Sequence, residues 1–187
     1  RDPAHLKSVS DAIAKREIAE GMSAGAVRLI PMIETAAAYF QALEIGNADT
    51  RNIAMSLGGE DFAFDVGMMP GAETLALPKQ QIVIAARGAG LIPLGLMGTV
   101  ADFRDLNRIR RAAEMARRFG VEGASCVHPS NVAILNAAFS PSSDEIYHAQ
   151  RIVDAYSDAK ERGNGAISVD GMMIDEPVVN RAKLLLG

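Results

Sequence analysis

Short apolar runs alternate with helix-compatible segments along most of the chain. Strands are predicted over residues 27–33, 52–57, 91–96 and 124–127, and their starts lie 25, 39 and 33 residues apart. This spacing is typical of a parallel α/β protein in which each strand is followed by a helix. Four such units are half of the eight that close a (β/α)₈ barrel, so the pattern favours the second half of one. A small doubly wound sheet is the alternative, although the dinucleotide fingerprint Gly-x-Gly-x-x-Gly follows no predicted strand.

Helical periodicity fills the segments between the strands. Helices are predicted over residues 2–20, 36–43, 79–89, 106–119, 132–139, 143–161 and 178–186. Residues 106–119 give a strongly amphipathic pattern, with Ile109, Ala113 and Ala116 on the inner side and most arginines outward. We interpret the arginine face as a solvated surface, with contact to an anionic ligand or partner as the alternative.

The composition is that of an ordinary globular protein. Hydrophobic residues make up 49% of the 187 residues, charged residues 22%, and the net charge is −4. These values argue against a nucleic-acid partner and favour a small-molecule partner. No apolar run reaches the length of about 18 residues that a membrane helix needs, so no membrane partner is expected. The single cysteine, Cys126, allows no disulfide framework, and the simplest compartment is the cytoplasm.

Two acidic residues follow the first two predicted strands. Glu34 comes directly after the first apolar run, and Asp61 comes four residues after the end of the second. Neighbouring parallel strands would carry both carboxylates to the same end of a sheet, where oxygen ligands suit a hard cation such as Mg²⁺. The alternative is that each carboxylate caps the helix that follows. Gly58 and Gly59 would let backbone N–H groups approach the carboxylate of a substrate.

Four further residues have open interpretations. Asp102 is expected near the same end of the sheet. His128 is either a general base or, as is more common, a hydrogen-bonded structural group. Cys126 lies in an apolar run and is expected in the core. Asp175 precedes Glu176-Pro177, so it either caps the last helix or brings an acid or base to a site made elsewhere.

Six short motifs follow one another from about residue 28 onward. They are Ile30-Pro31-Met32-Ile33-Glu34-Thr35, Gly58-Gly59-Glu60-Asp61-Phe62-Ala63-x-Asp65-x-Gly67, Ala85-Ala86-Arg87-x-Ala89-Gly90-Leu91, Asp102-Phe103-Arg104-Asp105, Cys126-Val127-His128-Pro129-Ser130 and Val169-Asp170-Gly171-Met172-Met173-Ile174-Asp175-x-Pro177. Together and in this order they resemble the citrate lyase β-subunit-like branch of the HpcH/HpaI aldolase superfamily. The resemblance implies a (β/α)₈ barrel, with residues 1–140 as its C-terminal part and residues 141–187 as a helical extension and lid.

The resemblance also implies a function. Members of this superfamily cleave or form C–C bonds in CoA thioesters of hydroxy acids, with Mg²⁺ or Mn²⁺ as the cofactor. By the resemblance, Glu34 and Asp61 match the two metal-ligating carboxylates. Groups around Gly58, Gly59 and Glu60 match the site for the carboxylate of a 2-oxo acid. We therefore expect an Mg²⁺-dependent C–C lyase that uses acyl-CoA or 2-oxo acid substrates.

Asp175 matches the acid/base aspartate that the family supplies from a C-terminal lid, commonly over a neighbouring subunit. A homo-oligomer, such as a trimer, is therefore expected. The family's early strands, with an arginine that grips the substrate carboxylate, have no counterpart in this sequence, so we expect that the chain needs another part to complete the site. Two alternatives stay open: a CoA-thioester hydrolase on the same site, and a non-catalytic barrel half that acts as an assembly or regulatory subunit.

Overall fold

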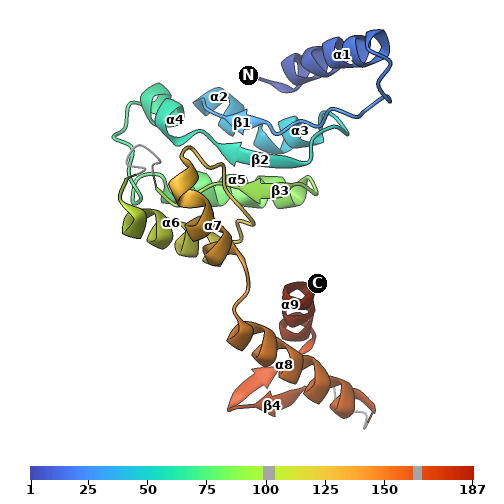
Figure 1. The fold of residues 1–187 in the computed structure, drawn as a ribbon, viewed down its shortest axis with the longest axis vertical. Coiled ribbons are helices and arrows are strands. Elements are labelled where there is room, and N and C mark those ends of the chain that lie inside the picture. The colour runs from blue at the N-terminus through green and yellow to red at the C-terminus, as the bar shows by residue number, and fades with distance from the viewer. Residues whose placement is uncertain (99–103, 162–165) are drawn as a thin grey trace. The chain divides into compact units, whose positions relative to one another are not determined.

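Parallel strands and helices alternate in the first part of the chain, as the hydrophobic pattern predicts (Figure 1). The computed structural model describes residues 1–98, 104–161 and 166–187, and the chain separates into two compact units, Arg1–Phe139 and Ser140–Gly187. The strands of the first unit are β1 (Met32–Ile33), β2 (Ala54–Leu57) and β3 (Ile92–Leu94). Its helices are α1 (Pro3–Ala19), α2 (Ala36–Tyr39), α3 (Ala42–Asn47), α4 (Gly59–Val66), α5 (Ala76–Gly88), α6 (Leu106–Arg118), the short 3₁₀ helix η1 (Pro129–Asn131) and α7 (Val132–Phe139).

The three strands form one parallel sheet in the order β1-β2-β3. Ile33 is in register with Leu57, and Ser56 is in register with Leu94. The first strand is shorter than predicted, because Pro31 has no N–H to donate and separates β1 from an isolated bridge between Leu29 and Asn52. The observed sheet confirms the α/β class. The half-barrel itself stays a prediction.

The predicted fourth strand over residues 124–127 is wrong. The chain pairs with β3 only through a single parallel bridge between Leu94 and Gly123, supported by a hydrogen bond from the Gly95 N–H to the Gly123 carbonyl. Pairing ends there, and Cys126 is exposed rather than buried in the core. Its Sγ donates to the His128 carbonyl oxygen at 3.0 Å. A short apolar run without continued ladder bonds therefore becomes a loop at the carboxyl end of the sheet.

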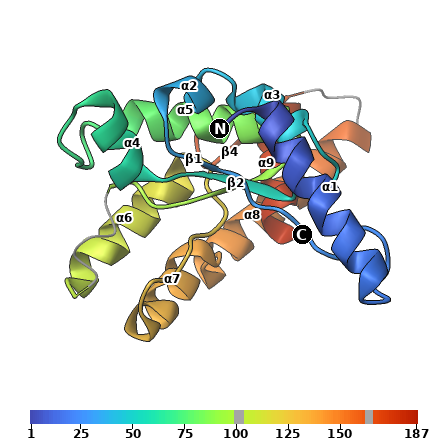
Figure 2. The ribbon, with the colours of Figure 1, turned by 90° about the horizontal axis from the view of Figure 1, so that it is seen from above.

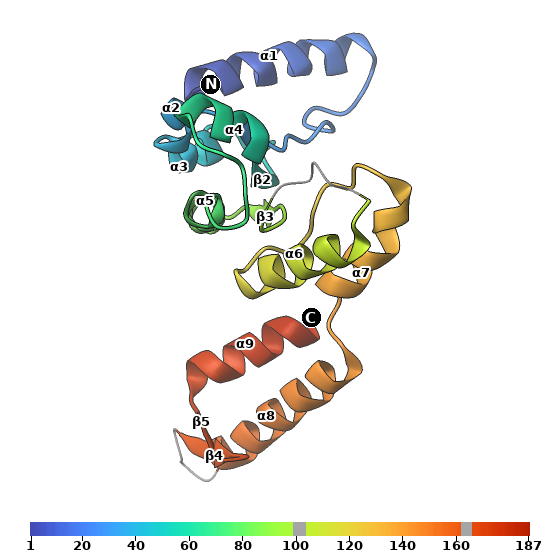
Figure 3. The ribbon, with the colours of Figure 1, turned by 90° about the vertical axis from the view of Figure 1, so that its left-hand side faces the viewer.

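Helices cover one face of the sheet. Figure 2 shows α2, α3 and α5 along the same side of the strands, where buried side chains from all of them share one hydrophobic core. The predicted helix over residues 36–43 is instead two helices, and Ala38 on α2 packs in the same core as Ala42 and Ile45 on α3. Helix α6 packs against α7, with Ile109, Ala113 and Ala116 buried as predicted (Figure 3).

A buried ion pair attaches α1 to the start of β2. The Arg51 guanidinium donates to both carboxylate oxygens of Glu17, at 2.7 and 2.6 Å, and its Nε donates to Ser10 Oγ at 3.2 Å. Both ionic side chains are at least nine-tenths buried. The hydrogen bond from Arg51 and one from the Val27 N–H hold the pKa of Glu17 down to about 2. The first helix is thus joined to the sheet by paired charges as well as by packing.

The second unit is a helical hairpin with a small sheet. It contains α8 (Ser143–Glu161), β4 (Ile167–Val169), β5 (Met172–Ile174) and α9 (Glu176–Leu186). The two strands pair antiparallel and are joined by Asp170 and Gly171, both with positive φ, which a two-residue hairpin turn of this kind requires. The capping signal at Ser142 is confirmed, because Ser142 and Glu145 exchange side-chain to backbone hydrogen bonds. None of the helices described here is long and apolar enough to cross a membrane.

Candidate active site

Glu34 and Gly58 lie side by side at the carboxyl end of the sheet. Glu34 follows β1 directly and Gly58 follows β2 directly, and the register of Ile33 with Leu57 sets them level. A Cβ placed on Gly58 would lie 2.6 Å from Cγ of Glu34 and 2.8 Å from its Oε1. Only glycine therefore lets the Glu34 carboxylate occupy this position against the N-cap of α4.

Asp61 and Glu60 lie in the first turn of α4, and both are exposed. Residue 58 is the N-cap of this helix and contributes no side-chain cap hydrogen bond. Negative charge in the first turn is favourable, because the unpaired N–H groups there carry a partial positive charge. The first turn of α4 therefore combines acidic side chains with backbone N–H groups that the N-cap residue, Gly58, does not cap.

Neither Glu34 nor Asp61 is a helix cap. Thr35 caps α2 instead, with its Oγ1 accepting from the Ala38 N–H at 3.2 Å. Asp65 on α4 accepts from the Ala36 N–H at 2.8 Å, which satisfies a further donor of the same helix end. The capping interpretation is thus wrong for Glu34. Asp61 is not the N-cap of α4, which is Gly58, but it lies in the first turn, where its charge opposes the positive end of the helix.

The two carboxylates suit a magnesium ion better than a metal that needs many protein ligands. They stand at the same end of two adjacent parallel strands, one of them held by the glycine that makes room for it. Within the described residues, no three His, Cys, Asp or Glu side chains form a cluster that could hold a metal ion. Mg²⁺ is commonly bound by one or two carboxylates, with waters and substrate oxygens completing its shell. Glu34 and Asp61 fit that requirement.

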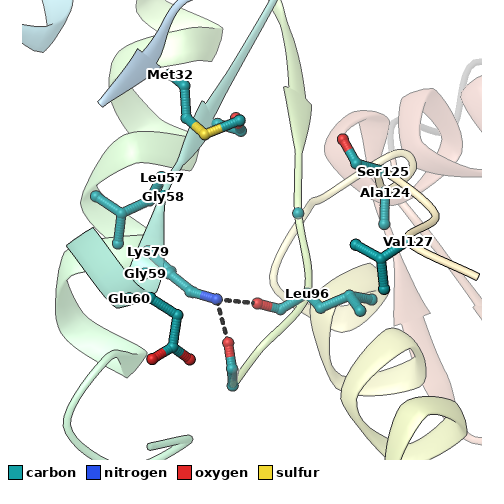
Figure 4. Close-up of a pocket in the computed structure, with 13 residues that line it drawn as sticks. Met32, Leu57, Gly58, Gly59, Glu60, Lys79, Leu96, Ala124, Ser125 and Val127 are labelled. Carbon is teal, nitrogen blue, oxygen red and sulfur yellow. Dashed lines mark hydrogen bonds between the residues drawn. The ribbon is translucent and has the colours of Figure 1, made fainter. Parts of the chain in front are cut away.

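A cavity of about 180 Å³ opens beside this end of the sheet (Figure 4). One wall is formed by Ser56 at the end of β2 and by Gly58, Gly59 and Glu60 after it. The opposite wall consists of the segment after β3 and the loop that replaces the predicted fourth strand. These lining residues are Gly95, Leu96, Gly98, Ala124, Ser125 and Val127. The predicted substrate-binding residues therefore line a common cavity.

Lys79 also lines this cavity, and our sequence interpretation did not identify it. Its Nζ donates to the carbonyl oxygen of Leu96 at 2.6 Å and to that of Gly98. Burial lowers the pKa of Lys79 to about 8, and the charge of Glu60 opposes this shift. A signal was present in the sequence, because Lys79 shares the helical face of Ile82 and Val83, which are buried. A cation among core positions indicates a specific partner.

Three further candidates from the sequence, His128, Asp175 and Asp102, are not among the described residues that line this cavity. The Nδ1 atom of His128 lies 2.8 Å from Ser130 Oγ and accepts from the Ser130 N–H, so the histidine caps η1, as the structural interpretation expects. Asp175 lies in the second unit and caps α9, its Oδ1 accepting from the Val178 N–H at 3.2 Å. Asp102 lies outside the described residues.

Known proteins are similar in sequence to most of this chain. Citrate lyase subunit beta of Leuconostoc mesenteroides subsp. cremoris is 30% identical over 185 residues, which cover 98% of this chain and 61% of that protein. Mitochondrial citramalyl-CoA lyase of Homo sapiens is 31% identical over 167 residues, which cover 84% of this chain and 48% of that protein. The chain thus spans about half to three fifths of the length of these relatives.

A solved structure shares the fold. The protein CitE from Mycobacterium tuberculosis, in complex with magnesium, acetoacetate and coenzyme A, has a TM-score of 0.72 and 26% identity. The match covers 85% of this chain and 60% of that one. A model of the HpcH/HpaI aldolase/citrate lyase family matches residues 1–129, well over half of the sequence. The chain therefore belongs to the HpcH/HpaI aldolase/citrate lyase family.

Proposed function

We propose that the protein containing this chain is an Mg²⁺-dependent C–C lyase that cleaves or forms CoA thioesters of hydroxy acids by way of a bound 2-oxo acid. The observation that carries the proposal is the Glu34 carboxylate held against Gly58, beside the acidic first turn of α4. The relatives named for citrate and citramalyl-CoA lyases and the CitE complex with magnesium support it.

Glu34 and Asp61 would hold the metal ion. Both are oxygen ligands at the carboxyl end of adjacent strands, where parallel sheets place their ligands. When bound, Mg²⁺ supplies Lewis acidity at the carbonyl of a 2-oxo acid. Mn²⁺, which also accepts oxygen ligands, would serve in its place.

The first turn of α4 would bind the carboxylate of that oxo acid. Gly58 and Gly59 line the cavity and carry no side chain that would keep a ligand from the backbone. The backbone N–H groups of Gly59 and Asp61 lie in the first turn of α4, where the helix itself offers them no carbonyl partner, and they can donate to an anion. The substrate would therefore be oriented by main-chain donors and by the two metal-binding carboxylates together.

Asp175 would move the proton on the methyl carbon of the acyl thioester. In the condensation direction it takes this proton, and in cleavage it returns a proton to the same carbon. Asp175 lies at the start of α9 and is half-buried, and its Oδ1 accepts a hydrogen bond from the Val178 N–H. Residues 141–187 would form the lid, which in a homo-oligomer such as a trimer would close over a neighbouring subunit.

The rest of the barrel would come from outside these 187 residues. The sheet presents Met32 and Ile92 at its surface, and they are 52% and 43% exposed. In the described structure β1 pairs only with β2, which leaves its outer edge open. Residues 1–140 would supply the C-terminal part of a closed (β/α)₈ barrel, and further strands would cover the exposed apolar side chains.

The test measures metal binding and product formation on the complete protein. Mg²⁺ or Mn²⁺ should raise the melting temperature of the wild-type protein, and Glu34→Ala combined with Asp61→Ala should abolish the rise. Glu73→Ala, at an exposed acidic residue near α5, is the matched control and should keep it. A rise that persists in the double variant would show that the metal binds elsewhere.

Assays of 2-oxo acid formation and of CoA release from the same reaction separate the possible activities. A lyase forms an oxo acid and an acyl-CoA, whereas a hydrolase releases free CoA. Oxo acid formation that disappears in the Glu34→Ala and Asp61→Ala double variant supports the lyase. Formation of neither product by the complete protein, tested over malyl-, citramalyl- and citryl-CoA, would count against catalysis.

A further inference from the structure

Lys79 is the feature of the cavity that the function proposed above leaves without a role. It lies on α5 at the same face as the buried residues Ile82 and Val83, so its stem starts on the core side of the helix. Figure 4 shows Nζ directed between the turn that holds Glu60 and the segment that holds Leu96.

The hydrogen bonds of Lys79 fix the ammonium group without neutralising it. Its Nζ donates to the Leu96 carbonyl oxygen at 2.6 Å and to the Gly98 carbonyl oxygen. An ammonium group has three N–H donors, so these two neutral acceptors leave capacity for a third. The bonds also hold the segment after β3 as one wall of the cavity. Lys79 is consequently a fixed positive charge at a cavity surface.

The charge lies beside the first turn of α4. A Cβ placed on Gly59 would lie 3.5 Å from Cε of Lys79 and 3.6 Å from its Nζ. Gly59 is the first residue of that helix, where unpaired N–H groups add a partial positive charge. Of the other cavity-lining residues, Glu60 is the acidic one, and it is exposed. The ammonium and the helix terminus therefore act on the same small region.

This environment favours an incoming anion. Burial lowers the pKa of Lys79 to about 8, which means that removal from water destabilises its charged form. A carboxylate within hydrogen-bond distance would compensate that loss, and a charge-assisted bond of this kind is stronger than one to a neutral acceptor. A cavity of about 180 Å³ is smaller than the usual site for a drug-sized molecule and suits a small acid.

We propose that Lys79 is a substrate-binding residue whose ammonium group holds the carboxylate of a small 2-oxo acid beside the first turn of α4. The inference rests on the proposed function, since it takes the substrate class from it. Lys79 would bind the negatively charged carboxylate of the acid, while Glu34 and Asp61 would hold the metal. The effect of Lys79 on acid binding can therefore be measured separately from the effect of the two carboxylates on metal binding.

The experiment compares two ligands of nearly the same shape in the complete protein with Mg²⁺ present. Pyruvate carries the carboxylate, and pyruvamide replaces it by a neutral amide. The variants are Lys79→Met, Lys79→Gln, which keeps a hydrogen-bond donor without the charge, and Lys79→Arg, which keeps the charge. Lys15→Met, at an exposed lysine on α1, is the matched control. Affinities come from calorimetric titration, and the Mg²⁺-dependent rise in melting temperature is measured for each variant.

Lys79→Met and Lys79→Gln should weaken pyruvate binding by roughly 10-fold or more, the expected effect of losing a charged hydrogen-bond donor. Pyruvamide binding should change by less than about 2-fold, and Lys79→Arg should retain pyruvate affinity far better than the neutral variants. The Mg²⁺-dependent rise in melting temperature should be the same in all three Lys79 variants as in the wild-type protein. Lys15→Met should match the wild-type protein in every measurement.

Two results would overturn the inference about Lys79 without contradicting the proposed function. Pyruvate affinity that is unchanged in Lys79→Met would show that the ammonium does not contact the ligand. Equal weakening of pyruvate and pyruvamide would show that Lys79 only holds the cavity wall in shape. A wild-type protein that binds neither Mg²⁺ nor pyruvate would instead refute the proposed function, and the inference would fall with it.

Discussion

The carboxylate of Glu34 occupies the space that a side chain at position 58 would need. Any Cβ on Gly58 would come within 2.8 Å of Oε1 and closer still to Cγ. The two residues follow adjacent parallel strands, so the register of the sheet produces this contact. A glycine in the loop after β2 thereby determines where the carboxylate after β1 can lie.

Gly58→Ala should displace Glu34 and weaken the metal site. The atoms that the methyl group would meet belong to a flexible, partly exposed side chain that can move aside, so we expect the folding free energy to fall by less than about 1 kcal/mol. The Mg²⁺-dependent rise in melting temperature should shrink or vanish, although no carboxylate is removed. The measurement is thermal unfolding with and without MgCl₂. Gly71→Ala is the control, because its Cβ would meet Thr74 Oγ1 only at 3.6 Å. A full Mg²⁺ response in Gly58→Ala would mean that the contact does not position the carboxylate.

Asp175→Asn should separate catalysis from folding. Asparagine is as good an N-cap as aspartate, so α9 and the melting temperature should be nearly unaffected. Turnover of the complete protein should fall by roughly 10²-fold or more, because a general acid/base group typically contributes at least that much to the rate. Asp175→Ser supplies a comparison that also keeps a cap. If the turnover of Asp175→Asn stays within a few-fold of wild type, Asp175 only caps α9 and is not the acid/base group.

A mixture of chains tests whether the lid serves a neighbouring subunit. Asp175→Asn chains have an intact metal site, and Glu34→Ala chains have an intact aspartate. Oligomers assembled from both should regain part of the activity that each variant lacks alone, if Asp175 completes the site of another subunit. Activity that is absent from every mixing ratio indicates instead that the lid closes over its own barrel.

The Glu17 and Arg51 pair should make stability depend on pH below about 4.5. The hydrogen bond from Arg51 lowers the folded-state pKa of Glu17 to about 2 from its ordinary value of 4.5. The contribution of the pair is therefore complete above pH 4.5 and is lost as the pH falls toward 2. Glu17→Gln should be less stable than wild type at pH 7, because Arg51 stays buried without its partner.

Urea unfolding at a series of pH values checks this prediction. The difference between wild type and Glu17→Gln should be constant near neutral pH and should narrow below pH 4.5. Glu20→Gln is the control, since Glu20 pairs with Arg16 on the exposed side of α1 and such pairs contribute little. A difference that stays the same down to pH 2.5 would contradict the assigned pKa shift.

The sequence alone determined the class of fold and the positions of the two carboxylates. Strand–helix alternation predicted a parallel α/β arrangement, and the positions of Glu34 and Asp61 after two apolar runs predicted that both lie at the same end of the sheet. These predictions depend on local periodicity and on the direction of parallel strands, which short stretches of sequence encode. The cap at Asp175 was predictable for the same reason, because Pro177 follows it closely.

Tertiary structure decided what local pattern could not. Residues 124–127 have the composition of a strand, yet a strand forms only where a neighbour continues the ladder, and here pairing stops at Gly123. Thr35 rather than Glu34 caps α2, a choice between adjacent residues that depends on backbone direction. Lys79 reaches the cavity only because α5 packs against the segment after β3, which brings its Nζ to the carbonyl of Leu96. Contacts between residues far apart in sequence thus assembled the cavity beside the end of the sheet at which local sequence had already placed the carboxylates.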